Sequence, residues 1–418
     1  MEEYIKKLLE QVRFEKAHKA IGDEIRAHIE DQIEANVLDG MDRESAERLA
    51  VEDMGDPADV GVSLDKVHRP RVAWGVIVFA MIVATLGSAV RIFMAHDAVI
   101  RGHYDSFDKR VFIICTVLGI ALMILFYFID FTTVAKCSRP AGIALIVFLV
   151  ISRFFNIYTN VADAINVLIV PLYAGIIYNY RGEKDKGFIK ALLWIGITGG
   201  VLYYDNSGMT AFLPALALVV QLSIAIKKKW INVPNRPAII SLWSVFIPLF
   251  TFYVYCICNA AKSVTGVTKE KTRALVESAK MVGRSNLHPV TWSPSNASVI
   301  TYIFGRMGIF TGITVILTVS VLIIIGFIAV FKSKNQLGLV MGSGCMVWLA
   351  SNAVMDSMIG FGFSPDFGDS TFLPFVSGSS GHYKDLIAAY AMLGILLSIY
   401  KFKDVYPQHV DIGFRIKK

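Results

Sequence analysis

The stretch that decides the fold is "STFLPFVSGSSGHYKDL", residues 370–386, directly before the last strongly apolar block of the chain. It combines Pro374, several glycines and small hydroxylated residues, and it ends at the start of a helix with Lys384 and Asp385. Non-helical backbone at the depth of a membrane is tolerated only where it is buried in protein or lines a wet cavity. We therefore expect this loop to cap a hydrated cavity that opens to the outer side of a bundle of membrane helices.

The composition of the whole chain agrees with a membrane protein. Of 418 residues, 55% are hydrophobic and 18% are charged, and the mean hydropathy is +0.54. Apolar blocks close to the length that crosses a bilayer recur along the sequence. We predict an all-α, polytopic membrane bundle of about ten transmembrane helices. The spans are expected at 72–95, 109–131, 140–158, 162–180, 187–203, 209–226, 237–259, 300–331, 337–361 and 383–402.

Residues 1–68 have a different character. Apolar residues recur there at helical spacing among many charges, as in Ile21, Ile25, Ile29 and Ile33. A turn at "GMD" makes Asp42 the expected N-cap of a further helix. We predict a small cytoplasmic domain of three or four helices, without a cleavable signal peptide, followed by a transmembrane domain over 72–405.

The charges predict topology. The net charge is +7, but the Lys and Arg residues cluster at the ends of apolar blocks, so we expect no nucleic-acid partner. The positive-inside rule makes both termini cytoplasmic. The opposite side then carries a large loop, about 260–298, and the loop before the last span. The five cysteines form no CxxC pair, and we expect neither disulfides nor a metal site.

The large loop contains "KEKTRALVESAKMVG", residues 269–283. Leu275, Ala279 and Val282 fall on one face among charges, which predicts an amphipathic helix on the outer leaflet or over the bundle. An ordinary solvated loop helix is the alternative.

Three motifs carry a resemblance to a known family. They are "LPFVSGSSG" at 373–381, "ESAKMVG" at 277–283 and "YIFGRMGIFTG" at 302–312. They resemble the LPFxSYGGSS, QSxxAIG and FIFxxxxEELG motifs of the SEDS family (FtsW, RodA and SpoVE). The resemblance covers residues 72–405. Residues 1–68 look like the permease-prefix or HAAS-type helical domain attached to many bacterial membrane proteins.

The resemblance implies a function in cell-wall synthesis. SEDS proteins polymerise lipid-linked disaccharide into peptidoglycan during growth, division or sporulation. It implies a bacterial cytoplasmic membrane protein whose ligand is an undecaprenyl-linked saccharide, with a penicillin-binding protein as partner and membrane lipid around it. No cofactor is implied, and a divalent cation is left open.

The family's implicated carboxylate directly precedes FIF, and this position is Thr301 here. A threonine hydroxyl does not titrate near neutral pH and is no general base, so we expect the catalytic position to be inactive. Glu277 or an aspartate of the last loop (Asp366, Asp369 or Asp385) is a candidate replacement. A solvated structural role is the alternative for each.

Ionisable residues inside the spans are expected to face a cavity or a partner. Arg306 in the eighth span and Asp356 in the ninth form our preferred pair, with Asn352 on the same face as Asp356. Snorkelling of Arg306 to the headgroups is the alternative. In the last loop, Ser379, Ser380, His382 and Lys384 are candidates to bind a phosphate or a sugar. A loop that only packs to close the bundle is the competing interpretation.

Three functional hypotheses follow. The first is a SEDS-like protein that acts on, or binds, the lipid-linked precursor, with glycosyl transfer as the reaction. The second is a non-catalytic scaffold or regulator of a cell-wall complex, favoured by Thr301. The third is a transporter of lipid or solute, favoured by Arg306 and Asp356 within the spans.

Overall fold

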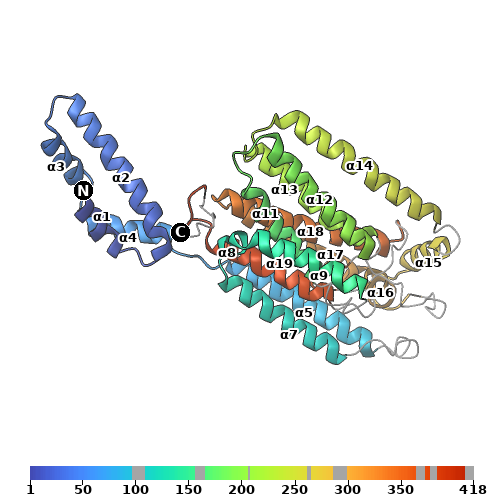
Figure 1. The fold of residues 1–418 in the computed structure, drawn as a ribbon. Helices are drawn as coiled ribbons and strands as arrows, with labels where there is room; N and C mark the ends of the chain where they lie inside the picture. The colour runs from blue at the N-terminus through green and yellow to red at the C-terminus, as the bar shows by residue number, and fades with distance from the viewer. Residues whose placement is uncertain are drawn as a thin grey trace. The chain divides into compact units, whose positions relative to one another are not determined.

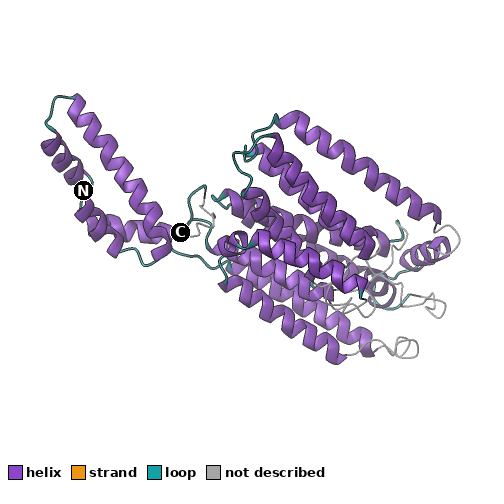
Figure 2. Cartoon of the chain, viewed as in Figure 1, coloured by secondary structure: helices purple, strands orange, loops and turns teal. Residues whose placement is uncertain are grey.

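The computed structural model describes residues 1–96, 109–155, 165–205, 208–260, 265–285, 299–363, 372–376 and 384–409. These residues form helices joined by turns, and no strand occurs within these ranges (Figure 1, Figure 2). The prediction of an all-α fold is confirmed.

The chain divides into two compact units. The first consists of Met1–Val72 with two short segments, Lys332–Gln336 and Tyr400–Asp411. The second consists of Ala73–Phe331, Leu337–Ile399 and Ile412–Lys418.

The first unit contains four helices, which are α1 (Glu2–Glu10), α2 (Glu15–Leu38), α3 (Arg43–Asp53) and α4 (Pro57–His68). Helix α1 packs against α4, and α2 packs against α3. As expected from the helical spacing, Ile21, Ile29 and Ile33 are buried. The predicted N-cap is confirmed, since the Asp42 carboxylate accepts the Ser45 N–H at 3.0 Å.

One buried carboxylate joins α1 to α4. Asp65 Oδ1 accepts the backbone N–H of Arg13 at 3.0 Å, and Oδ2 accepts Nε and Nη2 of the same residue at 3.0 and 2.6 Å. The hydrogen bonds from Arg13 lower the pKa of the Asp65 carboxyl below its ordinary value. The contact fixes the end of α1 on α4.

The other two segments of this unit are hydrogen-bonded to each other. The Asn335 side chain is fully buried and donates through Nδ2 to the Pro407 carbonyl at 2.7 Å. The Gln336 N–H donates to the Gln408 carbonyl at 3.1 Å. The chain after the last helix is therefore held by these polar contacts up to residue 408.

The second unit is a helical bundle. Its elements are α5 (Trp74–His96), α7 (Lys109–Phe128), α8 (Phe131–Lys136), α9 (Ser138–Phe154), η1 (Asn166–Leu168), α11 (Ile169–Tyr178), α12 (Asp185–Asp205), α13 (Gly208–Lys227), α14 (Asn235–Ala260), α15 (Thr265–Glu277), α16 (Val299–Met307), α17 (Ile309–Phe331), α18 (Gln336–Gly360) and α19 (Lys384–Lys401). The long helices of this unit run side by side (Figure 1).

A helix occupies each of the ten predicted spans. Two details of the prediction are wrong. The eighth span is two helices, α16 and α17, broken at Gly308. The short helix α8 was not expected; it follows Asp130, whose carboxylate accepts the Thr132 N–H at 3.0 Å.

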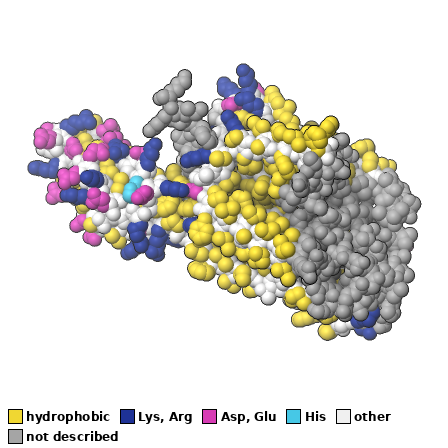
Figure 3. Space-filling view, turned by 60° about the horizontal axis from the view of Figure 1, so that its bottom comes forward, with side chains coloured by type: hydrophobic (Ala, Val, Ile, Leu, Met, Phe, Trp, Pro, Cys, Tyr) yellow, Lys and Arg dark blue, Asp and Glu magenta, His cyan; other side chains and the backbone are white. Residues whose placement is uncertain are grey.

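Burial differs strongly among these helices. All but one residue of α11 are buried, as are most residues of α18 and α19, whereas α14 has an apolar exposed surface that includes Ile240, Val245 and Phe252. Apolar side chains also cover much of the visible face of this unit (Figure 3). Such a surface is typical of helices that face lipid.

By length and composition, three of the described helices are able to cross a membrane: Asn235–Cys256, Ile309–Phe331 and Gln336–Gly360. Shorter apolar helices accompany them, at Trp74–Val90, Ile113–Phe128, Ser138–Ser152, Asn166–Tyr178, Phe212–Lys227 and Leu386–Lys401. The chain is a polytopic membrane bundle, as predicted.

Candidate functional site

The candidate site is built around the break between α16 and α17. Gly308 separates the two helices with φ +97°, a left-handed conformation that only glycine adopts at little cost. A Cβ at this position would lie 2.8 Å from the Val282 Cα, closer than real Cβ atoms come. Both the backbone angle and the packing therefore require glycine here.

Residues 280–285, which we name the bridging segment, satisfy the backbone at this break. The four hydrogen bonds run from Ile309 N–H to Lys280 O (2.9 Å), from Phe310 N–H to Met281 O (3.1 Å), from Gly283 N–H to Met307 O (3.2 Å) and from Ser285 N–H to Gly305 O (2.9 Å). Two of them serve the N–H groups that open α17, and two serve carbonyls that close α16. Broken helices within a membrane protein need such internal partners.

Helix α15 precedes the bridging segment and packs on α16. Leu275 is buried at 8% exposure and touches the α16 surface at Gly305. A helix does occur in the predicted segment and packs on α16, but of the three residues predicted to form its apolar face only Leu275 lies in it. Its predicted length is wrong, because the helix ends at Glu277. Val282 belongs to the bridging segment and is 76% exposed.

Two serines fix the bridging segment to the end of α15. The hydroxyl oxygens of Ser278 and Ser285 lie 2.6 Å apart, and Ser285 also donates to the Ser278 carbonyl at 3.2 Å. Ser285 is buried. This contact closes the bridging segment into a compact turn next to the break.

Thr301, the position of the family carboxylate, is buried at 1% exposure in α16. Its hydroxyl donates to the Gly360 carbonyl at 2.8 Å, at the C-terminal end of α18. The neighbouring rings of Phe304 and Phe361 meet edge to face at 5.1 Å. Thr301 therefore joins α16 to α18, and its hydroxyl proton is already engaged in a hydrogen bond.

The described part of the last loop, residues 372–376, is buried. Phe372 packs against Trp348 of α18 at 5.4 Å, and Phe375 packs against Tyr390 of α19 at 5.2 Å. Phe375 adopts a left-handed φ of +65°. A bulky residue in this conformation is held there by its surroundings. The two interpretations of this loop were binding of a phosphate or sugar and packing that closes the bundle. Residues 372–376 agree with packing.

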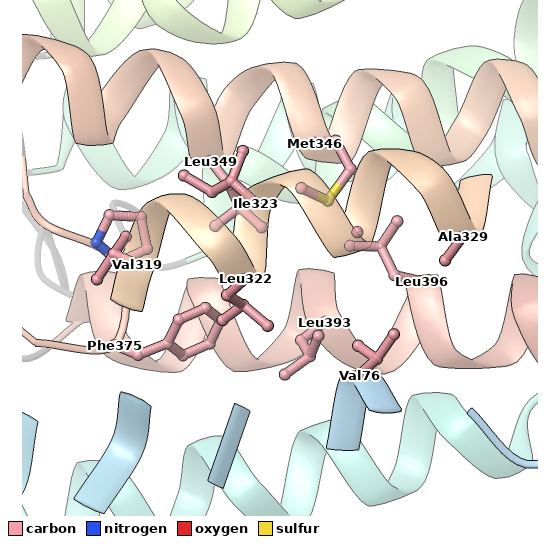
Figure 4. A pocket seen from close by; sticks show the side chains of 12 residues that line it. Val76, Val319, Leu322, Ile323, Ala329, Met346, Leu349, Phe375, Leu393 and Leu396 are labelled. Atoms are coloured by element: carbon pink, nitrogen blue, oxygen red, sulfur yellow. The ribbon is translucent and has the colours of Figure 1, made fainter. Parts of the chain in front are cut away.

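A cavity lies beneath this part of the loop (Figure 4). It has about 20 Å³ of space for the centre of a water-sized molecule. Its lining side chains are apolar and come from α5, α17, α18 and α19 as well as from Pro374 and Phe375. This cavity differs from the hydrated pocket that the polar loop predicted, since its lining offers no polar side chain. The hydrated pocket stays a prediction.

Of the predicted intramembrane residues, Arg306 lies next to the break, and Asn352 and Asp356 lie in α18. Arg306 is half-buried in the last turn of α16, where a cation interacts favourably with the helix dipole. Asn352 and Asp356 are buried in α18 at 2% and 5% exposure. Asn352 Nδ2 donates to the Trp348 carbonyl at 2.9 Å, and Asp356 and Arg306 each take part in at least one interaction. Their pairing and their binding role stay predictions.

The remaining predicted site residues are spread over different parts. Glu277 is exposed at the end of α15 and pairs with Arg273 at 2.8 Å. Lys384 begins α19. Ser379, Ser380 and His382 lie outside the described residues, as do Asp366 and Asp369. Within the described ranges, no group of three or more His, Cys, Asp or Glu side chains is placed to hold a metal ion.

Sequence reasoning did not identify several residues that shape this region. Gly308 and Ser285 were not singled out, although the pair of glycines in "FGRMG" was a signal for a break in the helix. The engagement of Thr301 with Gly360 had no signal, because the two residues are far apart in the sequence.

No family model matches this sequence, and no curated protein matches it. Solved structures do match its fold. One comes from a study described as "Structural coordination of polymerization and crosslinking by a peptidoglycan synthase complex", with TM-score 0.56, 14% identity, and coverage of 79% of this chain and 97% of that chain.

Two further solved structures that match are of the rod shape determining protein RodA of Thermus thermophilus. Its structure matches with TM-score 0.52 and 13% identity over 79% of this chain and 97% of that chain. A variant with one aspartate replaced by alanine matches with TM-score 0.54 and 14% identity over 79% and 98%. At such identities the likeness establishes the fold, and the predicted SEDS-type fold is confirmed.

Proposed function

We propose, on the premise that this chain has the fold of RodA, that it acts in bacterial cell-wall synthesis by binding a lipid-linked peptidoglycan precursor. The observation that carries the proposal is the extent of the match, since the chain covers 97% of the RodA structure. The match therefore extends over nearly the whole of that chain and over 79% of this one.

The proposed ligand is an undecaprenyl-linked saccharide, and the residues near the break suit its polar part. Arg306 supplies a cation for a pyrophosphate, and Asn352 and Asp356 supply hydrogen-bonding groups for a sugar. Lys384, Ser379, Ser380 and His382 are proposed to complete the polar site from the last loop. The lipid part would remain among the apolar helices of the bundle.

A penicillin-binding protein is the proposed partner. The similar chain from the peptidoglycan synthase complex supports this, because that structure concerns the coordination of polymerization with crosslinking. We place the chain in the bacterial cytoplasmic membrane with both termini inside, as the distribution of Lys and Arg favours.

A second function, a non-catalytic scaffold or regulator, is favoured by Thr301. Glycosyl transfer needs a base near the attacking hydroxyl, and the Thr301 hydroxyl donates to the Gly360 carbonyl. If the chain transfers glycosyl groups, another carboxylate, such as Glu277, has to act as the base.

Binding of fluorescent lipid-linked disaccharide to the full chain in nanodiscs tests the proposal. We expect saturable binding that Arg306→Gln weakens by roughly tenfold, because a charge-assisted contact contributes about 1.5–3 kcal/mol. Arg236→Gln, at an exposed position that starts α14, is the matched control and should leave binding unchanged. Absence of saturable binding would refute the proposal, and equal saturable binding by all three proteins would refute the role assigned to Arg306.

Polymerisation separates the two functions. The wild type and the two variants are each given labelled lipid-linked disaccharide, with and without a partner penicillin-binding protein. Polymer that depends on this chain indicates a glycosyltransferase. Binding without polymer, with polymer made by the partner, indicates a scaffold.

A further inference from the structure

Three loops meet at the end of the bundle where α11 and α13 finish. The loop after α11 pairs with the loop after α13 through two backbone hydrogen bonds, from Gly182 N–H to Trp230 O at 2.8 Å and from Asn232 N–H to Glu183 O at 2.9 Å. The start of α9 joins them, because Arg139 Nη2 donates to the Asn179 carbonyl at 3.4 Å. These contacts bring distant parts of the sequence onto one surface.

This surface is strongly basic. We name as the basic face the exposed cations that these loops carry: Arg139, Arg181, Lys184, Lys227, Lys228 and Lys229. The acidic residues of the same loops are Glu183 and Asp185, and Glu183 is engaged by Lys190 at 2.8 Å. The local charge is therefore positive, and like charges on one surface repel one another.

Aromatic side chains hold two of the cations in place. The Arg139 guanidinium lies over the Tyr180 ring at 5.0 Å, and the Arg181 guanidinium lies 5.5 Å from the Tyr178 ring centre. Arg181 Nη1 also donates to the Tyr178 hydroxyl at 3.0 Å. The guanidinium groups therefore have fixed positions at the surface.

Lys229 occupies a position that favours glycine. Its φ is +57°, and two hydrogen bonds define the helix end: Lys229 N–H to Ile226 O at 2.9 Å and Trp230 N–H to Ala225 O at 3.0 Å. This is a Schellman motif with lysine at the left-handed residue. Trp230 is fully buried and packs edge to face on Tyr178 at 4.7 Å. The chain therefore has a lysine at a position where glycine would adopt the backbone conformation at lower energy.

The basic face borders the apolar surface of the bundle. Ile189 and Leu193 near the start of α12 are 55% and 57% exposed, and Ile240 near the start of α14 is 66% exposed. Lipid-facing residues therefore begin within about two turns of the cations. This spacing puts the basic face at the level of the lipid headgroups.

We propose that the basic face binds the phosphate headgroup of an anionic phospholipid in the adjoining leaflet. Fixed guanidinium groups donate hydrogen bonds to phosphate oxygens in a defined geometry, and the lysines at the end of α13 add electrostatic attraction. The proposal goes beyond the proposed function, because it concerns the end of the bundle where α11 and α13 finish and uses none of the residues assigned to the precursor. It explains why repulsive cations and a strained lysine occur together.

Native mass spectrometry of the purified full chain tests this. The chain is incubated with equal amounts of phosphatidylglycerol and phosphatidylcholine, and the retained lipids are counted. We expect preferential retention of phosphatidylglycerol. Lys227→Gln, Lys228→Gln and Lys229→Gly combined should reduce the preference by at least about tenfold, since each basic residue near a membrane surface contributes measurably to anionic-lipid binding.

The matched control removes three exposed cations from the first unit, by Arg43→Gln, Arg48→Gln and Lys66→Gln. It should leave the preference unchanged. The proposal would be overturned if the wild type showed no preference for phosphatidylglycerol. It would also be overturned if both triple variants lost the preference equally, because the net charge of the chain would then determine lipid retention.

The single variant Lys229→Gly separates binding from folding. Glycine relieves the left-handed backbone, so the melting temperature should stay the same or rise. Retention of phosphatidylglycerol should nevertheless fall. Unchanged retention in this variant and in the triple variant would mean that the cations serve only topology and the helix dipole.

Discussion

At the scale of single residues, the candidate site depends on positions whose backbone conformation is unusual. Gly308 and Phe375 both have positive φ, at +97° and +65°. The first allows two helices to meet at an angle with their ends satisfied by the bridging segment. The second lies in the turn within the buried residues 372–376. Residues in such conformations persist only where their neighbours determine them.

Replacing Gly308 by alanine is expected to destabilise the fold by roughly 1–3 kcal/mol. The new Cβ would be 2.8 Å from the Val282 Cα, so the bridging segment has to move. Thermal unfolding of the full chain in detergent, followed by tryptophan fluorescence, measures this. Gly196→Ala on α12 is the control, because a Cβ there meets open space. An equal melting temperature for both variants would contradict the requirement for glycine.

Thr301→Val is expected to cost about 1–3 kcal/mol, because the buried Gly360 carbonyl loses its donor. Thr301→Ser keeps the hydroxyl and should cost less. Thr301→Asp should be worse than Thr301→Ser, since a carboxylate accepts and would face the Gly360 carbonyl. The order of the three melting temperatures is the measurement. A stability of Thr301→Asp equal to wild type would show that the position tolerates a catalytic carboxylate.

At the scale of elements, the apolar periodicity of the sequence predicted every long helix, because burial and lipid contact both act on whole faces. It did not predict the break at Gly308 or helix α8, whose causes are local turn chemistry and contacts from distant residues. Ser398 of α19 shows this, since its hydroxyl donates to the Ile129 carbonyl at 2.7 Å and accepts the Phe131 N–H at 3.2 Å. No local pattern near α8 contains that partner.

The same limit applies to the candidate site. Arg306, Asn352 and Asp356 were predicted because charge and polarity are conspicuous within apolar spans. The backbone bonds of the bridging segment were not, because main-chain groups carry no sequence signal. Thr301 could be aligned with a family position, but its hydrogen bond to Gly360 required coordinates.

The junction of α1 and α4 should depend on pH. The pKa of Asp65 is lowered by its hydrogen bonds to Arg13, so its stabilising effect is present above the ordinary value of 3.8. It is lost as the pH falls through the lowered pKa. Hydrogen exchange of α1 and α4 in the full chain, corrected for intrinsic rates, should show protection falling in that acidic range. Asp65→Asn should show weaker protection of α1 and α4 that does not fall further in the acidic range. If the variant lost protection over the same pH range as the wild type, Asp65 would be excluded as the cause.

Across the whole molecule, glycines allow close contact between parts from both ends of the membrane sequence: α5 meets residues 375–376, and α19 meets α7. A Cβ at Gly87 of α5 would lie 2.8 Å from the Val376 Cα, and a Cβ at Gly394 of α19 would lie 2.8 Å from the Met123 Cα. In membranes, small residues allow such close approach of backbones. The first and last membrane helices therefore share one core.

Gly87→Leu and Gly394→Leu are expected to lower the melting temperature of the entire bundle by similar amounts, because each separates backbones that are in contact. Gly199→Leu on α12, where a Cβ meets open space, should have little effect. The measurement is thermal unfolding together with yield from the membrane. A loss confined to one of the two core variants would argue against a shared core.

The contact between α8 and Ser398 has a consequence for biosynthesis. Phe131 and Ser398 are 267 positions apart, so the early helices leave the ribosome long before their last partner is made. Until α19 enters the bilayer, the backbone groups near Phe131 lack the hydroxyl that completes their hydrogen bonds. During translation these helices need either a chaperone within the membrane or temporary contacts with lipid and water, and a chain that stops before α19 should be an early substrate for membrane proteases.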